Sequence, residues 1–347
     1  MSFIPEWAPN LHPLIVHFPI GILFTAALID VFGLLVKDRD FPRRAAMVLY
    51  VLGGIAATAA YFTGEAAADS VFLPNAANAL LTEHSDLGHY TFYFFAGFAV
   101  IRLITFFSGV EKSFLVRLIQ TAFGLGGLAL LTYTADHGAR MVFQHGVGVA
   151  AVDASPVVAI PTADSSAVGP QTLDNGGWAW RPSRAAAWQK EAVLSGSFTS
   201  SLMDGGERGD VLALTTSGEP AAFWFDIPMT SVQIDAALDL TDFDGTVMLM
   251  HHVIDSENYH FMAISKEDMR LGRSENGDLY IMDNKPYDAT GWHSYRVVGD
   301  QTHFRAYSDE ELVTHGHGDD PGSGFVGVRL NGTGTVRMAS IQVLPVR

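Results

Sequence analysis

The chain has 347 residues, a formal charge of −16 and no cysteine, and 48% of its residues are hydrophobic. The negative charge argues against a nucleic-acid partner, because the phosphate backbone requires a basic binding surface. A chain without cysteine has no disulfides, no thiolate metal sites and no covalently attached c-type haem, which leaves His, carboxylate or Met side chains as metal ligands.

The composition changes along the chain. Long apolar runs fill the sequence before about residue 150, and short segments broken by Gly, Asp and Asn follow after about residue 170. We therefore predict an α + β multidomain protein: a four-helix transmembrane bundle at 1–150, an extended linker at 151–172 and an all-β sandwich or jelly roll at 173–347. The first nine residues lack the basic start and cleavage site of a signal peptide, so we expect the first helix to be retained.

Four apolar segments, at 13–36, 45–62, 88–107 and 115–134, are long enough to cross a bilayer, which takes about 20 helical residues. Basic residues lie close to the connections within the first pair and within the second pair of segments. They are Lys37, Arg39, Arg43, Arg44, Lys112 and Arg117. Because such loops stay in the cytoplasm, we predict a multi-pass protein of the bacterial inner (plasma) membrane. Both termini and the C-terminal domain are then extracytoplasmic (periplasmic).

An internal repeat links the first and third segments. Three pairs of residues share one spacing of 72 (84 − 12, 89 − 17 and 102 − 30): His12 and His84, His17 and His89, and Asp30 and Arg102. The repeat predicts a duplicated helical hairpin whose equivalent helices run parallel. Asp30 and Arg102 then lie at similar depth, and we expect a structural ion pair because an unpaired charge in lipid is costly.

Six histidines are expected at the outer face of the membrane. They are His12, His17, His84, His89, His137 and His145. One interpretation is that some of them bind haem b or a metal, since neutral imidazole is the usual ligand for both. His17, His89 and His137 are best placed for this, on three different helices near the hydrocarbon boundary. The alternative is that the rings cap helix ends and bond backbone carbonyls at the interface.

Short motifs around these histidines carry a family resemblance. They are His12-Pro13-x-x-x-His17-Phe18-Pro19-Ile20, Thr63-Gly64, His89, Asp136-His137-Gly138 and His145-Gly146-Val147-Gly148. Over roughly the first 150 residues this set resembles the bacterial DUF2231 family of four-helix membrane proteins. The resemblance implies a membrane domain, and because related domains occur beside cytochrome-like modules it favours a redox cofactor.

Short strand-like segments fill the C-terminal half. We expect them at 222–227, 232–238, 245–253, 259–264, 279–282, 292–298, 302–307, 324–330 and 335–343. Turns are predicted between them, among others at Asn276-Gly277 and at Asn331-Gly332-Thr333-Gly334. Regularly spaced short strands indicate a β-sandwich or jelly roll.

The passages at 258–262, 291–297, 304–307 and 324–329 resemble the concanavalin A-like lectin/glucanase superfamily, in particular its laminin-G-like and DUF1080-like branches. That superfamily includes sugar-binding modules, glycoside hydrolases and adhesion domains, so the fold does not choose a function. A glycosidase needs two carboxyl groups, and segment 245–253 carries two histidines but no acid. Trp178, Trp180 and Tyr280 are the aromatic residues that we expect to be exposed for stacking on sugars.

These features favour a membrane-anchored accessory or binding subunit whose outer sandwich docks on a partner protein or a glycan. Such a subunit would belong to a larger membrane complex, respiratory or photosynthetic. The first alternative is a redox protein that binds haem b or a metal through the outer histidines, and the second is a membrane-tethered sugar-active enzyme. Membrane lipid is an expected partner of the helices in every case, and a role as an enzyme is the less favoured interpretation.

Overall fold

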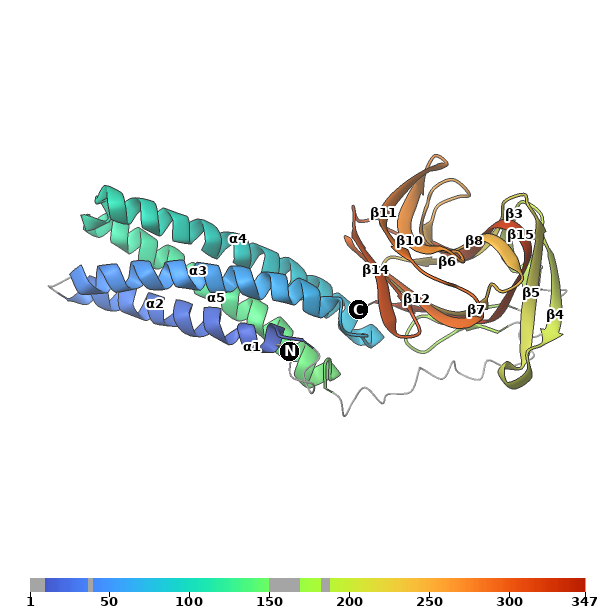
Figure 1. Ribbon diagram of the computed structural model, residues 1–347, viewed down its shortest axis with the longest axis horizontal. Helices are drawn as coiled ribbons and strands as arrows, with labels where there is room; N and C mark the ends of the chain where they lie inside the picture. The colour runs from blue at the N-terminus through green and yellow to red at the C-terminus, as the bar shows by residue number, and fades with distance from the viewer. Residues whose placement is uncertain (1–9, 37–39, 150–168, 182–187, 347) are drawn as a thin grey trace. The chain divides into compact units, whose positions relative to one another are not determined.

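The computed structural model describes residues 10–36, 40–149, 169–181 and 188–346. The chain divides into two compact units (Figure 1). One consists of Met1–Val71 and Leu80–Asp153, and the other of Phe72–Ala79 and Ala154–Arg347. Lys37, Arg39 and most of the predicted linker lie outside the described residues.

Long apolar helices make up the first unit (Figure 1). Their bounds are α1 (His12–Ile15), α2 (His17–Leu35), α3 (Asp40–Ala68), α4 (Asn78–Ser108) and α5 (Phe114–His145), with the short 3-10 helix η2 (Val110–Lys112). Another 3-10 helix, η1 (Asn75–Ala77), falls in the second unit. α1 and α2 together form one stretch, so the described residues contain four helical stretches long and apolar enough to cross a membrane. The four predicted segments are thereby confirmed, and α3 to α5 continue beyond them into more polar turns.

The repeat is visible in the packing of equivalent histidines. A side chain added at Gly64 on α3 would meet the His12 ring at 3.1 Å, and one added at Gly138 on α5 would meet the His84 ring at 3.1 Å. Each hairpin therefore seats its first histidine against a glycine of its second helix, where the missing side chain leaves room for the ring.

The second unit is an antiparallel β-sandwich, as predicted. Its strands are β1 (Gln171–Thr172), β2 (Trp178–Trp180), β3 (Ala192–Ser195), β4 (Thr199–Asp204), β5 (Asp210–Ser217), β6 (Ala221–Met229), β7 (Val232–Asp239), β8 (Phe243–Val253), β9 (Tyr259–Ile264), β10 (Asp268–Glu275), β11 (Asp278–Pro286), β12 (Trp292–Asp300), β13 (His303–Ser308), β14 (Glu311–His317) and β15 (Gly324–Pro345), with 3-10 helices η3 (Trp188–Lys190) and η4 (Gly206–Arg208). The main path of hydrogen-bonded neighbours is β11-β10-β9-β8-β15-β7-β12-β13-β14. The sandwich begins at β1, just inside the predicted linker.

The turn predicted at Asn331-Gly332-Thr333-Gly334 is wrong, because β15 runs through it without a break. The first part of β15 pairs with β6 and β8, and its last part pairs with β7 and β2, so a single strand joins the two layers. A side chain at Gly332 would collide with the carbonyl oxygen of Asp244. Glycine is needed here for the close approach of two strands, not for a reversal of the chain.

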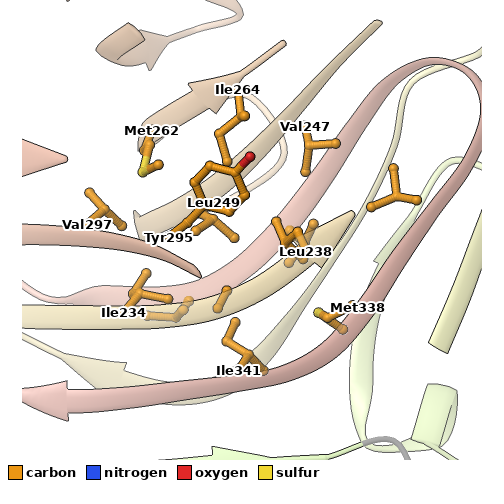
Figure 2. Packing of buried hydrophobic residues seen from close by; sticks show 14 of the residues in the cluster. Ile234, Leu238, Val247, Leu249, Met262, Ile264, Tyr295, Val297, Met338 and Ile341 are labelled. Carbon is orange, nitrogen blue, oxygen red and sulfur yellow. The ribbon is translucent and has the colours of Figure 1, made fainter. Parts of the chain in front are cut away.

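The core of the sandwich lies between its two layers. Ile234, Leu249, Tyr295 and Ile341 come from different strands and belong to one buried cluster (Figure 2). Trp178 and Trp180 also belong to this cluster and are only 1% exposed. The prediction that they are exposed for sugar stacking is wrong, because β2 pairs with β15 and buries both rings.

Phe72–Ala79 belongs to the sandwich unit although it precedes α4 and overlaps its first turn. The Arg296 guanidinium lies 4.1 Å from the centre of the Phe72 ring, and its Nη1 donates to the carbonyl oxygen of Leu73 at 2.9 Å. Asn78 Nδ2 donates to Gln233 Oε1 at 3.0 Å. The sequence placed this segment in the membrane domain, because contacts between such distant residues leave no local pattern.

Candidate functional site

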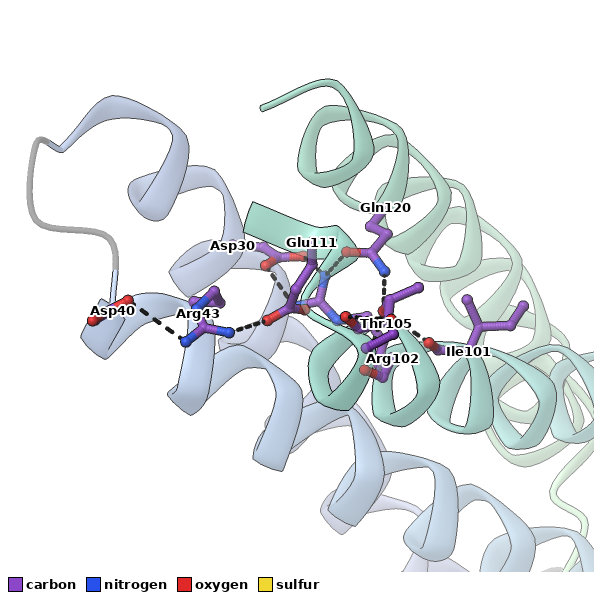
Figure 3. Close-up of polar contacts among 9 residues, drawn as sticks. Asp30, Asp40, Arg43, Ile101, Arg102, Thr105, Glu111 and Gln120 are labelled. Atoms are coloured by element: carbon purple, nitrogen blue, oxygen red, sulfur yellow. Dashed lines mark hydrogen bonds and ion pairs between the residues drawn. The ribbon is translucent and has the colours of Figure 1, made fainter. Parts of the chain in front are cut away.

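A buried ion pair connects the two repeats. Arg102 on α4 donates from Nη1 to Asp30 Oδ2 at 3.1 Å and from Nη2 to Asp30 Oδ1 at 2.9 Å, and both side chains are buried (Figure 3). The planar guanidinium matches both carboxylate oxygens at once. The two charges that the repeat placed at equal depth therefore lie in direct contact.

The same arginine reaches the other two long helices. Arg102 Nη1 also donates to Gln120 Oε1 on α5 at 3.0 Å, and Gln120 Nε2 donates to Thr105 Oγ1 at 2.7 Å (Figure 3). On α3, the ring of Tyr50 lies 5.1 Å from the Arg102 guanidinium carbon. From α4, this one side chain thus contacts the other three helical stretches, which makes it a structural centre of the helical unit.

A second ion pair joins the first turn of α3 to η2, which directly precedes α5. Arg43 Nη1 donates to Glu111 Oε1 at 2.9 Å, and Arg43 also lies 3.5 Å from Asp40 (Figure 3). Burial raises the pKa of Glu111, and the hydrogen bond from Arg43 opposes that rise. These contacts hold together the helix ends opposite to the histidines.

His12 and His84, one from each repeat, lie side by side with ring centres 6.3 Å apart. His84 Nδ1 is 2.9 Å from the carbonyl oxygen of Thr134, to which it donates. His12 Nδ1 lies 3.4 Å from Thr63 Oγ1. In both rings Nδ1 contacts a neighbouring helix, which leaves Nε2 as the nitrogen for a ligand.

The favoured trio, His17, His89 and His137, is joined by no ring contact within the described residues. His137 is buried, donates from Nδ1 to its own helix and places Nε2 3.1 Å from Glu83 Oε2. His89 is exposed and contacts two tyrosine rings, His17 is exposed, and His145 ends α5. In the described part of the helices, no three His, Asp or Glu side chains bring ligand atoms within 4.8 Å of one another.

Three more histidines lie inside the sandwich, on β8 and β9. His252 Nε2 donates to the carbonyl oxygen of Thr230 at 2.7 Å, so its Nδ1 accepts from His251 Nδ1 at 2.6 Å. His260 is near both rings. Burial lowers the pKa of His251 and His252 and brings the pKa of His260 to about 4, so all three are neutral at pH 7.

The hairpin of β10 and β11 presents an exposed apolar strand. Asn276 and Gly277 both have positive φ, as the predicted two-residue turn requires. Among the described strands, β11 pairs only with β10. Leu279, Tyr280 and Ile281 are 49%, 47% and 46% exposed, so apolar groups stand in solvent on both faces of this strand.

A hollow on the sandwich unit measures about 80 Å³ and is lined by residues that include Phe72, Asp235 and Arg296. Sites for small molecules typically occupy about 300–1,000 Å³. Asp235 is already paired with Arg296 at 2.5 Å. This hollow therefore lacks both the room and the free carboxylate pair that sugar hydrolysis needs.

Comparison with known proteins bears on both halves. Residues 8–151 match the family model described as "Predicted membrane protein (DUF2231)", which confirms the resemblance noted from the sequence. No curated protein sequence matches the chain significantly.

Solved structures resemble the C-terminal sandwich in architecture. The carbohydrate-binding module CBM66 from Bacillus subtilis is 15% identical, with a TM-score of 0.36; the match covers 43% of this chain and 91% of the CBM66 chain. A galectin-like protein of unknown function from Bacillus subtilis is 10% identical, with 47% and 94% coverage and a TM-score of 0.38. A structure described as a native glycosidic hydrolase is 12% identical, with 50% and 98% coverage and a TM-score of 0.36.

The buried ion pair predicts a strong effect of removing one charge. Asp30→Leu leaves Arg102 buried without its carboxylate, and we expect a loss of about 3–5 kcal/mol in the free energy of unfolding. The double variant Asp30→Leu, Arg102→Leu should recover much of that loss. Unfolding of the purified protein in detergent, followed by helical circular dichroism, measures both.

The exposed pair of Asp136 and Arg140 on α5 supplies the control. Asp136→Leu should cost less than about 1 kcal/mol, because water already solvates those charges. Equal effects of the two single variants would contradict a central role for the buried pair.

Proposed function

Since residues 8–151 form a DUF2231 membrane-protein domain, we propose that this chain is a membrane-anchored binding subunit whose sandwich docks on a partner protein. The observation that carries the proposal is the exposed apolar strand β11. The helices serve as the anchor, since they are long and apolar enough to cross a membrane and pair the buried charges of Asp30 with Arg102 and of Glu111 with Arg43.

Both the edge position of β11 and its exposed apolar residues favour a protein partner. An edge strand with exposed apolar side chains is a template for pairing, and soluble proteins usually protect such edges. An extended segment of a partner could add to this edge through backbone hydrogen bonds, with Leu279, Tyr280 and Ile281 in contact on either face. A glycan stacked on Tyr280 is the competing ligand.

The proposed location is the bacterial inner membrane, with the sandwich outside the cytoplasm. In the helical unit the contacts of His12, His84 and His137 lie at one end and the pair of Arg43 and Glu111 at the other. Basic helix ends favour the cytoplasmic side, which supports placing the histidine end outside.

A pair of single-cysteine variants tests this orientation, and the lack of native cysteine makes the labelling specific. Ser70 precedes α4 at the histidine end, and Ser113 precedes α5 at the opposite end; both are exposed. With a membrane-impermeant maleimide on intact cells, we expect Ser70→Cys to be labelled and Ser113→Cys to react only after permeabilisation. The reverse pattern would place the sandwich in the cytoplasm.

Site-specific crosslinking in native membranes tests the docking surface. A photo-crosslinking residue in place of Tyr280 should yield a protein adduct of defined mass, because that side chain would face the partner. The control is the same residue in place of Met203 on β4, which is exposed to a similar extent at 42% but lies on another strand. Adducts at neither position, or equally at both, would contradict docking at β11, and a polysaccharide adduct at 280 alone would favour the glycan.

A second candidate function is redox, with haem b or a metal bound by the outer histidines. The contact between His12 and His84 favours it, since the two repeats bring their rings together and leave Nε2 of each as a ligand atom. These residues would hold the group at the histidine end, and a bound haem would supply one-electron chemistry.

An absorption spectrum tests this second candidate. Protein purified after expression with added haem should show a Soret band that His84→Ala removes and His293→Ala, in the sandwich, retains. A spectrum without this band, together with no metal by elemental analysis, would eliminate the redox function.

A further inference from the structure

We propose that His303, His315 and His317 form a binding site for a divalent transition-metal ion such as Zn²⁺ on the outer side of the β13–β14 hairpin. The site uses none of the histidines of the helices and none of the exposed apolar residues of β11. Three observations support it: the register of β12, β13 and β14, the different exposure of the three histidine rings, and the buried carboxylate of Asp300.

The antiparallel register brings the three rings together. His303 on β13 lies directly opposite His317 on β14, and His315 is two residues before His317 on the same face. The ring centres are 4.6 Å apart for His303 and His317, and 4.7 Å apart for His315 and His317. One nitrogen from each ring lies within 4.8 Å of the other two. Small side-chain rotations would bring all three to the Zn–N distance of about 2.0–2.1 Å.

Three imidazoles select the class of ion. Imidazole nitrogen suits Zn²⁺, Cu²⁺, Ni²⁺ and Fe²⁺, whereas Ca²⁺ and Mg²⁺ prefer oxygen ligands. His303 is buried, His315 is half-buried and His317 is exposed, so an ion could enter from the solvent side. Three protein ligands with a solvent-facing fourth position are typical of zinc sites that keep a water or another small ligand.

A buried acid lies beside the first of the three rings. Asp300 on β12 lies directly opposite His303, so the two side chains share one face of the sheet. Asp300 is 2% exposed, and within the described structure its Oδ2 has no hydrogen-bond partner. A carboxylate next to a ligating histidine orients the ring and balances the charge of the ion.

Arg305 is a positive charge that opposes a cation at this site. It lies directly opposite His315 and is buried on the same face. A divalent ion would therefore meet one guanidinium, and the Asp300 carboxylate offsets that charge. The guanidinium also favours an anionic fourth ligand, such as hydroxide, over a neutral one.

Zinc binding to the full-length protein in detergent tests the site. After treatment with a chelator, equilibrium dialysis against Zn²⁺ with elemental analysis should give one tightly held ion per chain. His317→Ala should weaken binding at least tenfold, and because this ring is exposed the variant should fold. Asp300→Asn should weaken binding about 10–100-fold, as for other carboxylates that support a ligating histidine.

Two controls separate this site from other histidines. His293→Ala changes a histidine of the same sandwich that pairs with Asp309, and it should leave Zn²⁺ binding unchanged. The double variant His12→Ala, His84→Ala should also leave it unchanged. No retained ion, or a retained ion that His317→Ala does not affect, would overturn the proposal. Titration with Ca²⁺ should show no binding at this site, and equal affinity for Ca²⁺ would contradict ligation by imidazole.

Discussion

The contact between Arg102 and Asp30 is the constraint on which the helical unit depends. A buried guanidinium is costly unless it meets a carboxylate and other acceptors, and here Asp30 and Gln120 accept from Arg102. The pair forms where Asp30 and Arg102 lie at the same depth, as the shared spacing of the two repeats provides. The same spacing sets His12 beside His84, so the ion pair and the histidine contact both follow from the repeat.

Strand β15 has the corresponding role in the sandwich. Because it belongs to both layers, it fixes the register of β7 and β8, and through β7 that of β12 and β13. The alternation of side chains along those strands then decides which histidines face inward. His251 lies inside next to Phe304, whereas His303, one residue before that phenylalanine, lies on the outer face. Two histidine clusters with different chemistry thus arise from one ladder.

The sequence predicted the features that depend on residues close together in the chain or on a simple repeat. Apolar length identified the helices, the repeat paired Asp30 with Arg102, and Asn276-Gly277 identified a hairpin turn. Contacts that depend on distant strands were missed or misassigned. Trp178 and Trp180 lie in a short segment flanked by polar residues, and only the pairing of β2 with β15 shows that both rings are buried. Similarly, the pairing of β13 with β14 is what brings His303 next to His315 and His317. The spacing of two histidines around a glycine was a signal for a metal site, but the position of His303 requires the register.

Strand β11, the proposed docking strand, is connected to the cluster of His303, His315 and His317 within the sandwich. Asp283 on β11 accepts a hydrogen bond through Oδ2 from the backbone nitrogen of His315 at 3.1 Å. A partner that adds to β11 and an ion held by His315 therefore act on one shared contact. If a bound ion changes the affinity for the partner by some factor, the bound partner changes the affinity for the ion by the same factor, because coupling between two binding equilibria is reciprocal. If β11 docks a partner and His315 holds an ion, as proposed, Asp283 provides a physical route by which the two binding events depend on each other.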